Sequence, residues 1–180
     1  MDYESAVTTI EKTIRTIPDY PKPGIMFRDI TPVLKDRDAF RACIDALVEK
    51  TMGMKVDYIV GIDARGFIIG GAMAYEMGIG FIPARKKGKL PHKSVRVEYE
   101  LEYGTDALEM HEDALGSEDR VLIVDDLLAT GGTAGAVGKL VEKLGAETAG
   151  YAFVVELPGL KGRERLDGKE IVSLVKFEGE

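Results

Sequence analysis

The stretch Val121-Leu-Ile-Val-Asp125-Asp126-Leu-Leu-Ala129-Thr130-Gly131-Gly132-Thr133 carries most of the information about the fold and the function of this chain. Four apolar residues are followed by two carboxylates, and then by a turn of small residues that opens a helix. A strand that is apolar along its length is typical of a parallel sheet covered on both faces. Because ligands bind at the carboxyl ends of strands in such sheets, we expect a binding site at this turn.

The turn predicts a site for a phosphate group. Glycines let backbone N–H groups converge on an anion without obstruction by Cβ atoms, and the N-terminus of the next helix adds its positive dipole end. The stretch is not a Walker loop, since no lysine follows the glycines, and it lacks the G-x-G-x-x-G pattern of dinucleotide sites. The predicted phosphate-binding residues are Ala129, Thr130, Gly131, Gly132 and Thr133.

The two carboxylates indicate what is attached to the phosphate. Asp125 and Asp126 would repel a phosphate unless they bind another part of the ligand. Carboxylates accept strong hydrogen bonds from hydroxyl groups, and the adjacent hydroxyls of a ribose are natural partners. We therefore predict a sugar phosphate with a cis-diol as the ligand. The competing interpretation is a strand end with solvated acids and an ordinary helix N-cap.

Apolar segments of strand length alternate with segments of helical periodicity. Strands are predicted at residues 56–62, 79–85, 120–126 and 148–156, and helices at residues 4–16, 37–52, 67–77 and 133–144. Asp36 is a candidate N-cap and Gly145 a candidate C′ residue. Ile17 is expected on the apolar face of the first helix, and Thr31-Pro32 is expected to end regular structure. The alternation predicts the α/β class, with a mostly parallel twisted sheet flanked by helices.

Composition narrows the function. The chain has 24 Lys and Arg residues and 31 Asp and Glu residues. The resulting net charge of −7 argues against nonspecific nucleic-acid binding. The single cysteine, Cys43, is predicted to be a buried apolar thiol; it can form no internal disulfide, and one cysteine with two distant histidines makes no zinc cluster. His111 is expected at the surface. With neither a signal peptide nor a membrane span in the sequence, we expect a cytoplasmic protein with no membrane or nucleic-acid partner.

The Val121–Thr133 stretch resembles the signature of the type I phosphoribosyltransferases, which bind phosphoribosyl pyrophosphate. Further blocks, in family order and spanning about residues 20–166, resemble the adenine-specific branch of that family. They are Pro23–Pro32, Asp63–Phe67, Arg85–Pro91, Tyr99–Gly104 and Leu160–Glu164. The resemblance implies a single phosphoribosyltransferase domain over residues 1–180, with an N-terminal hood at 1–34. The charged, tyrosine-rich residues 92–111, which break the alternation, would form an extended flap.

The resemblance also implies binding roles. Phe27 would stack on adenine, the backbone at Met26 and Arg28 would recognise the edge of the base, and Leu127 would cover its other face. Pyrophosphate would be held by the loop that follows the strand at 56–62, with a cis peptide at Asp63-Ala64. The predicted pyrophosphate-binding residues are Ala64, Arg65, Arg85 and Lys89; the last two belong to a cationic run that follows a buried strand.

The implied reaction is adenine plus 5-phosphoribosyl 1-pyrophosphate giving AMP plus pyrophosphate. Glu102, in the flap beside Tyr103, would accept a proton near N7 of the purine as N9 attacks the sugar. The expected catalytic residues are Glu102, Arg65, Asp125 and Asp126. Mg²⁺ carried by the substrate is the expected cofactor, with no metal held directly by the protein, and the family implies a homodimer.

Two alternatives stay open at this point. The base could be another one, such as hypoxanthine, xanthine or a pyrimidine. The chain could also be a regulator that senses nucleotides without catalysis; such regulators usually carry a DNA-binding appendage, and residues 1–20 are too short for one.

Overall fold

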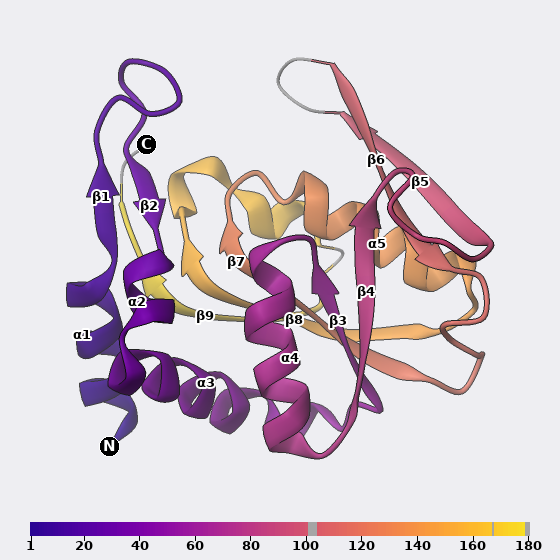
Figure 1. Ribbon diagram of the computed structural model, residues 1–180, viewed down its shortest axis with the longest axis horizontal. Helices are drawn as coiled ribbons and strands as arrows, with labels where there is room; N and C mark the ends of the chain where they lie inside the picture. The colour runs from indigo at the N-terminus through magenta and orange to yellow at the C-terminus, as the bar shows by residue number, and fades with distance from the viewer. Residues whose placement is uncertain (101–103, 167, 179–180) are drawn as a thin grey trace.

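The computed structural model describes residues 1–100, 104–166 and 168–178 and has the predicted α/β architecture (Figure 1). Its main sheet has seven strands in the order β5-β6-β4-β3-β7-β8-β9. The strands β3, β4, β7, β8 and β9 are parallel, while β5 and β6 form an antiparallel hairpin that pairs with β4. The bounds are β3 Tyr58–Ile62, β4 Gly80–Lys86, β5 Ser94–Glu100, β6 Thr105–His111, β7 Arg120–Leu128, β8 Glu147–Glu156 and β9 Glu170–Lys176.

Helices cover both faces of this sheet. The helices of one face are α1 Tyr3–Thr13, α3 Arg37–Thr51 and α4 Arg65–Met77, and α5 Gly132–Lys143 covers the other. One hydrophobic core lies on each face of the sheet, and successive residues of a strand point into different cores. Ile59 of β3 packs with α3 and α4, while Val60 packs with α5. This two-sided burial is the reason for the continuous apolar runs in the sequence.

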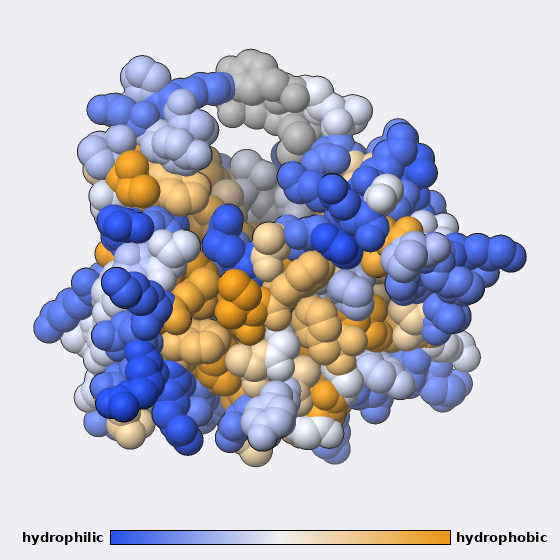
Figure 2. Space-filling view, viewed as in Figure 1, coloured by the Kyte–Doolittle hydropathy of each residue, from blue (hydrophilic) through white to orange (hydrophobic). Residues whose placement is uncertain are grey.

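A separate two-stranded sheet lies in the segment predicted as the hood. It pairs β1, Arg15–Ile17, with β2, Phe27–Asp29, and α2, Thr31–Lys35, follows. In Figure 1 this hairpin and the β5–β6 hairpin rise on either side of the edge where β7 ends, and Figure 2 shows an opening between them. The carboxyl ends of the central strands therefore face the space that these two hairpins border.

Local sequence signals account for several boundaries. The Asp36 side chain caps α3 by accepting hydrogen bonds from the backbone N–H groups of Asp38 and Ala39. Gly145 has a φ of 84°, as expected of a C′ residue. Cys43 is buried, and this burial raises the pKa of its thiol to about 12. Within the described residues no helix is long and apolar enough to cross a membrane.

Four expectations are wrong. Ile17 lies in β1 because the first helix ends at Thr13, and Thr31-Pro32 forms the start of α2 because proline is tolerated in the first turn of a helix. His111 is half-buried, with its ring centroid 5.8 Å from that of His92. Strand β7 continues past residue 126 to Leu128.

The sequence analysis also missed β9. The described residues of the connection from β8 to β9 form two short 3₁₀ helices, η2, Pro158–Leu160, and η3, Gly162–Arg165, and no α-helix. Without an intervening α-helix, the periodicity that marks a βαβ unit is absent.

Candidate active site

The carboxyl end of β7 carries the predicted acidic pair. The Asp126 side chain is 8% exposed and forms an ion pair with Arg65. The backbone N–H of Asp126 donates to Oδ1 of Asp125 at 2.9 Å. Burial, together with the negative charge of Asp126, raises the pKa of Asp125 well above its ordinary value. One carboxylate is thus paired with a cation, while its neighbour binds a proton more readily than a solvated aspartate does.

The loop between β3 and α4 brings Arg65 to this pair. Its Asp63–Ala64 peptide is cis, as the family resemblance implied. A Cβ on Gly66 would lie 2.6 Å from the carbonyl oxygen of Val124, so a glycine is needed where the loop packs against β7. The hydrogen bond to Asp126 raises the pKa of Arg65, so the guanidinium stays charged.

Arg85 reaches the same loop from the end of β4. Its Nε atom lies 3.2 Å from Oδ2 of Asp63, and its guanidinium carbon lies 5.7 Å from the ring centroid of Phe67. The backbone carbonyl of Lys89 accepts a hydrogen bond from Arg85 at 3.4 Å, and Lys89 itself is exposed. The structure thus brings Ala64, Arg65 and Arg85 together and places the Lys89 backbone beside Arg85.

The phosphate loop, residues 129–133, borders a cavity of about 210 Å³ between β7 and α5. Gly131 has a φ of 79°, a left-handed conformation that favours glycine, and it is the N-cap of α5. The first N–H groups of a helix have no intrahelical partner, so this backbone suits an anion. The lining consists of Arg65, Asp125, Asp126, Leu127, Leu128, Ala129, Thr130, Gly131, Gly132, Thr133 and Ala134.

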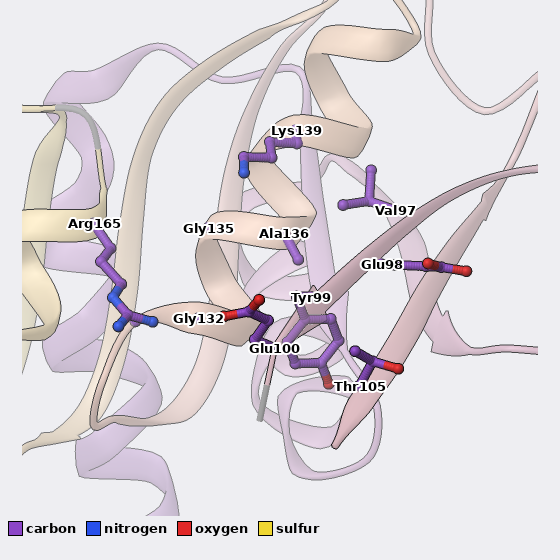
Figure 3. A pocket seen from close by; sticks show the side chains of 11 residues that line it. Val97, Glu98, Tyr99, Glu100, Thr105, Gly132, Gly135, Ala136, Lys139 and Arg165 are labelled. Atoms are coloured by element: carbon purple, nitrogen blue, oxygen red, sulfur yellow. The ribbon is translucent and has the colours of Figure 1, made fainter. Parts of the chain in front are cut away.

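A larger cavity of about 650 Å³ adjoins the first, since Gly131 and Gly132 line both (Figure 3). One wall is formed by the β5–β6 hairpin and the other by the first turns of α5, with Arg165 pointing toward Gly132. Burial raises the pKa of Tyr99, and a hydrogen bond between its hydroxyl and the Thr133 side chain opposes that shift. The flap hairpin therefore contacts the phosphate loop directly.

Comparison with known proteins identifies the chain. Residues 31–178 match the phosphoribosyl transferase domain family. The chain is 55% identical over 172 residues to the adenine phosphoribosyltransferase of Parvibaculum lavamentivorans, covering 94% of this chain and 98% of that one. The chain belongs to the adenine phosphoribosyltransferases.

Solved structures of other adenine phosphoribosyltransferases have the same fold. That of Thermoanaerobacter pseudethanolicus has a TM-score of 0.92 and 54% identity over 95% of this chain and 99% of its own. That of Saccharomyces cerevisiae, complexed with an imino-altritol bisphosphate and adenine, has a TM-score of 0.90 and 40% identity over 96% of this chain and 99% of its own. The predicted fold class and the assignment to an adenine-specific enzyme are confirmed.

In the structure of this adenine phosphoribosyltransferase, the predicted base-binding residues lie in two different places. Leu127 lines the phosphate cavity, whereas Met26, Phe27 and Arg28 lie in the hood and line neither of the two cavities. Met26 is exposed, and the edge of Tyr20 packs on the half-buried ring of Phe27 at 5.2 Å. The Arg28 side chain donates to Oγ1 of Thr16 at 2.6 Å and stacks on the Phe177 ring at 4.1 Å, so its contacts hold the hood to the C-terminal segment.

Glu102 and Tyr103 lie outside the described residues, so their predicted roles stay predictions. Sequence reasoning missed Arg165 and Tyr99, which both line the larger cavity. The family blocks could have pointed to both residues. Arg165 directly follows the block Leu160–Glu164, and Tyr99 is the first residue of the block Tyr99–Gly104.

The raised pKa of Asp125 predicts a pH-dependent cost to stability. Because the folded carboxyl binds its proton more tightly than in the unfolded chain, ionisation destabilises the fold progressively as pH rises above the ordinary value of 3.8. Asp125→Asn retains an acceptor for the Asp126 N–H but cannot ionise. Urea titrations give the unfolding free energy of this variant minus that of the original protein. We expect this difference to be higher at pH 8 than at pH 4 by about 1 kcal/mol or more. The control is Glu118→Gln, which changes an exposed carboxylate and should show no such pH dependence. A constant difference for Asp125→Asn would refute the raised pKa.

Proposed function

We propose that the ribose 5-phosphate part of the substrate binds at the carboxyl end of β7 and the phosphate loop. The enzyme converts adenine and 5-phosphoribosyl 1-pyrophosphate to AMP and pyrophosphate, the reaction of purine salvage. The main evidence for this binding site is the cavity of about 210 Å³. Its lining combines two carboxylates, a guanidinium and the backbone at a helix N-terminus. The carboxylates accept hydrogen bonds from the vicinal diol, and the Ala129–Thr133 backbone donates to the 5-phosphate.

Arg65 and Arg85 hold the diphosphate on the other side of the ribose. Among the described residues, the Arg65 guanidinium forms an ion pair with Asp126, and its remaining N–H donors can serve a second anion. Ala64 offers the backbone of the same loop, and Lys89 adds a cation beside Arg85. Positive charge placed where negative charge develops on the leaving group stabilises the transition state.

Adenine binds between the hood and Leu127. Phe27 stacks on one face of the purine, the backbone at Met26 and Arg28 recognises its edge, and Leu127 covers the other face. Two observations support this arrangement. Leu127 is only half-buried at the cavity, and Asp29, two residues after Phe27, lies close enough to raise the pKa of Arg65. The hood therefore faces the site.

The chemical step is attack of N9 on C1 of the ribose as the bond from C1 to the diphosphate oxygen breaks. The ribose gains oxocarbenium character, and the two electrons of the broken bond leave with pyrophosphate. Glu102 accepts the purine proton near N7, and Tyr103 lies beside it in the flap. The flap excludes water, because hydrolysis of the sugar diphosphate competes with transfer. These roles rest on the family resemblance of the Tyr99–Gly104 block.

Mg²⁺ enters with the substrate as its expected cofactor. Asp125 and Asp126 would accept the ribose hydroxyls at the cavity, while Mg²⁺ would take its oxygen ligands from the substrate and from its own water shell. When bound, the ion offsets the negative charge of the diphosphate. The protein's own contribution is to orient the ribose hydroxyls with the carboxylates and the leaving group with Arg65.

A homodimer forms through the exposed face of α4. Ile68 and Tyr75 are 49% and 89% exposed on this helix, and Figure 2 shows apolar residues gathered on this side of the molecule. A groove of about 530 Å³ runs between α3 and α4, and its rim carries both Arg37 and Glu76, so charges of both signs can pair across a two-fold axis. Ile68 lies one helical turn after Arg65, which would place the interface beside the site.

Three further expectations from the sequence stay predictions: the single domain over residues 1–180, its division into a hood at 1–34 and a flap at 92–111, and the cytoplasmic location.

Asp126→Asn tests the ribose assignment. We expect AMP formation to fall by about a hundredfold or more, since the amide accepts hydroxyl hydrogen bonds less strongly and no longer balances Arg65. The measurement is chromatographic product analysis with adenine, hypoxanthine, xanthine and uracil, each with the sugar diphosphate and Mg²⁺. Only adenine should react with the original enzyme, and Asp113→Asn should leave its rate unchanged. If Asp126→Asn turned over almost as fast as the original enzyme, the assignment of Asp126 to the ribose would be wrong.

Glu102→Gln tests the proton acceptor. The amide cannot accept the N7 proton, so the rate constant for transfer should fall by about a hundredfold, while the affinity for adenine changes little. Single-turnover kinetics and equilibrium binding of adenine separate the two effects. Glu112→Gln, which changes an exposed carboxylate just after β6, is the control. Equal rates for both variants would leave Glu102 without a chemical role.

Ile68→Glu tests the dimer. A carboxylate buried without a partner in an interface is costly, so the variant should be a monomer in light scattering coupled to size-exclusion chromatography. Met52→Glu places the same charge at a methionine that is 70% exposed elsewhere on the surface, and it should remain a dimer. A dimeric Ile68→Glu protein would exclude this face as the interface.

A further inference from the structure

Outside the residues assigned to the reaction, an exposed arginine forms an ion pair with a buried carboxylate. Glu156, at the end of β8, has a side chain only 5% exposed. Arg163 of η3 donates to both of its carboxylate oxygens, from Nε at 2.6 Å and from an Nη atom at 2.7 Å. Ser173 of β9 donates to the same carboxylate, and Arg163 also reaches the Ser173 hydroxyl at 3.2 Å. Bidentate pairing of this kind fixes orientation as well as charge.

The segment held by this pair packs directly on the phosphate loop. A Cβ on Gly162 would lie 2.4 Å from the carbonyl oxygen of Ala129 and 3.1 Å from the backbone nitrogen of Gly131. A Cβ on Gly131 would lie 2.4 Å from the carbonyl oxygen of Gly162. The two backbones are therefore in close contact, and the Leu128 side chain also lies against Gly162, with its Cδ1 atom 2.8 Å from such a Cβ. Gly162 is buried, and it immediately precedes Arg163 in the chain.

Both ends of the segment are attached to the core. The backbone N–H of Leu157 donates to the carbonyl of Leu128 at 3.0 Å, directly before the phosphate loop. At the other end, Leu166 is fully buried in the core cluster that includes α5. Between these points Arg163 supplies a side-chain attachment, and Arg165, two residues later, lies beside Gly132 at the mouth of the site.

We propose that Arg163, through Glu156, is a positioning residue for the phosphate loop: it presses residues 158–165 against Ala129–Gly131 and so holds the backbone donors in place for the 5-phosphate. The proposal rests on the function assigned to this loop above. Arg163 makes no substrate contact in it. The pair also holds the pKa of Glu156 below its ordinary value, so the attachment persists over the neutral pH range.

The position of the Arg163–Glu156 ion pair predicts which ligands bind more weakly when the pair is disrupted. The 5-phosphate belongs to the phosphate loop, whereas pyrophosphate belongs to the Arg65 loop on the other side of the ribose. Disturbing residues 158–165 should therefore weaken the sugar diphosphate and AMP, but it should leave pyrophosphate and adenine nearly unchanged. A residue that only stabilises the fold would lower the melting temperature without this selectivity.

Gly162→Ala tests the contact itself. The added methyl must displace the phosphate loop or the segment, so the KM for the sugar diphosphate and the Kd of AMP should each rise about tenfold, equivalent to about 1.4 kcal/mol. The Kd of pyrophosphate and the KM of adenine should change less than twofold. Gly159→Ala is the matched control, because a Cβ there meets nothing within 4 Å.

Arg163→Met and Arg163→Lys test the ion pair. Methionine should reproduce the selective loss, and lysine, which keeps the charge but not the bidentate geometry, should restore part of the affinity for AMP. If Arg163→Met does not fold, Arg163→Lys and Gly162→Ala still decide the matter. The assays are AMP formation and titration calorimetry, run well below the melting temperature of each variant.

The outcomes separate this proposal from the assigned function. Unchanged AMP affinity in Gly162→Ala and Arg163→Lys, or equal losses for AMP and pyrophosphate, would overturn the positioning role even if the original enzyme forms AMP normally. Failure of the original enzyme to form AMP, or full activity of Asp126→Asn, would instead overturn the site on which the proposal rests.

Discussion

The site depends on the compensation of one buried negative charge. Asp126 stands at the end of a central strand with its carboxylate almost out of solvent, and a buried carboxylate without a partner is strongly destabilising. Arg65 supplies that partner from the start of α4, just after the loop that follows the neighbouring parallel strand β3. The pair can form because Gly66 lets its loop lie against the Val124 carbonyl. The same ion pair therefore joins the proposed ribose and diphosphate ends of the site, and it partly neutralises the acidic pair beside the proposed phosphate loop.

Three distant parts of the chain surround the phosphate loop. The Arg65 loop borders the cavity from β3, Tyr99 of the flap reaches Thr133, and Gly162 packs against the loop from behind. A loop that must present backbone N–H groups to an anion has few side chains of its own with which to fix its shape. Its conformation is consequently imposed by what packs around it, and glycines are required at the points of closest contact.

Local signals were sufficient for much of the fold. The apolar run before Asp125 identified a central strand, and Asp36 identified the start of a helix, because both effects operate within a few residues. The errors arose where local rules allow two outcomes. Pro32 can end a segment or begin a helix, and only its neighbours in space decide. Strand β9 gave no βαβ pattern, since its pairing with β8 is a contact between strands joined by short 3₁₀ helices.

The sequence by itself determined which chemical groups the proposed site has available: two carboxylates that can accept hydrogen bonds from hydroxyls, followed by a glycine-rich turn whose backbone N–H groups can bind a phosphate. The tertiary structure alone decided which charges meet. Arg65 and Asp126 are 61 residues apart, and Arg163 finds Glu156 only because β8, η3 and β9 are packed together. Such pairs depend on strand order and loop path, which no short window of sequence contains. The family block Leu160–Glu164 includes Arg163 and ends just before Arg165, but the partners of these two arginines became visible only in the fold.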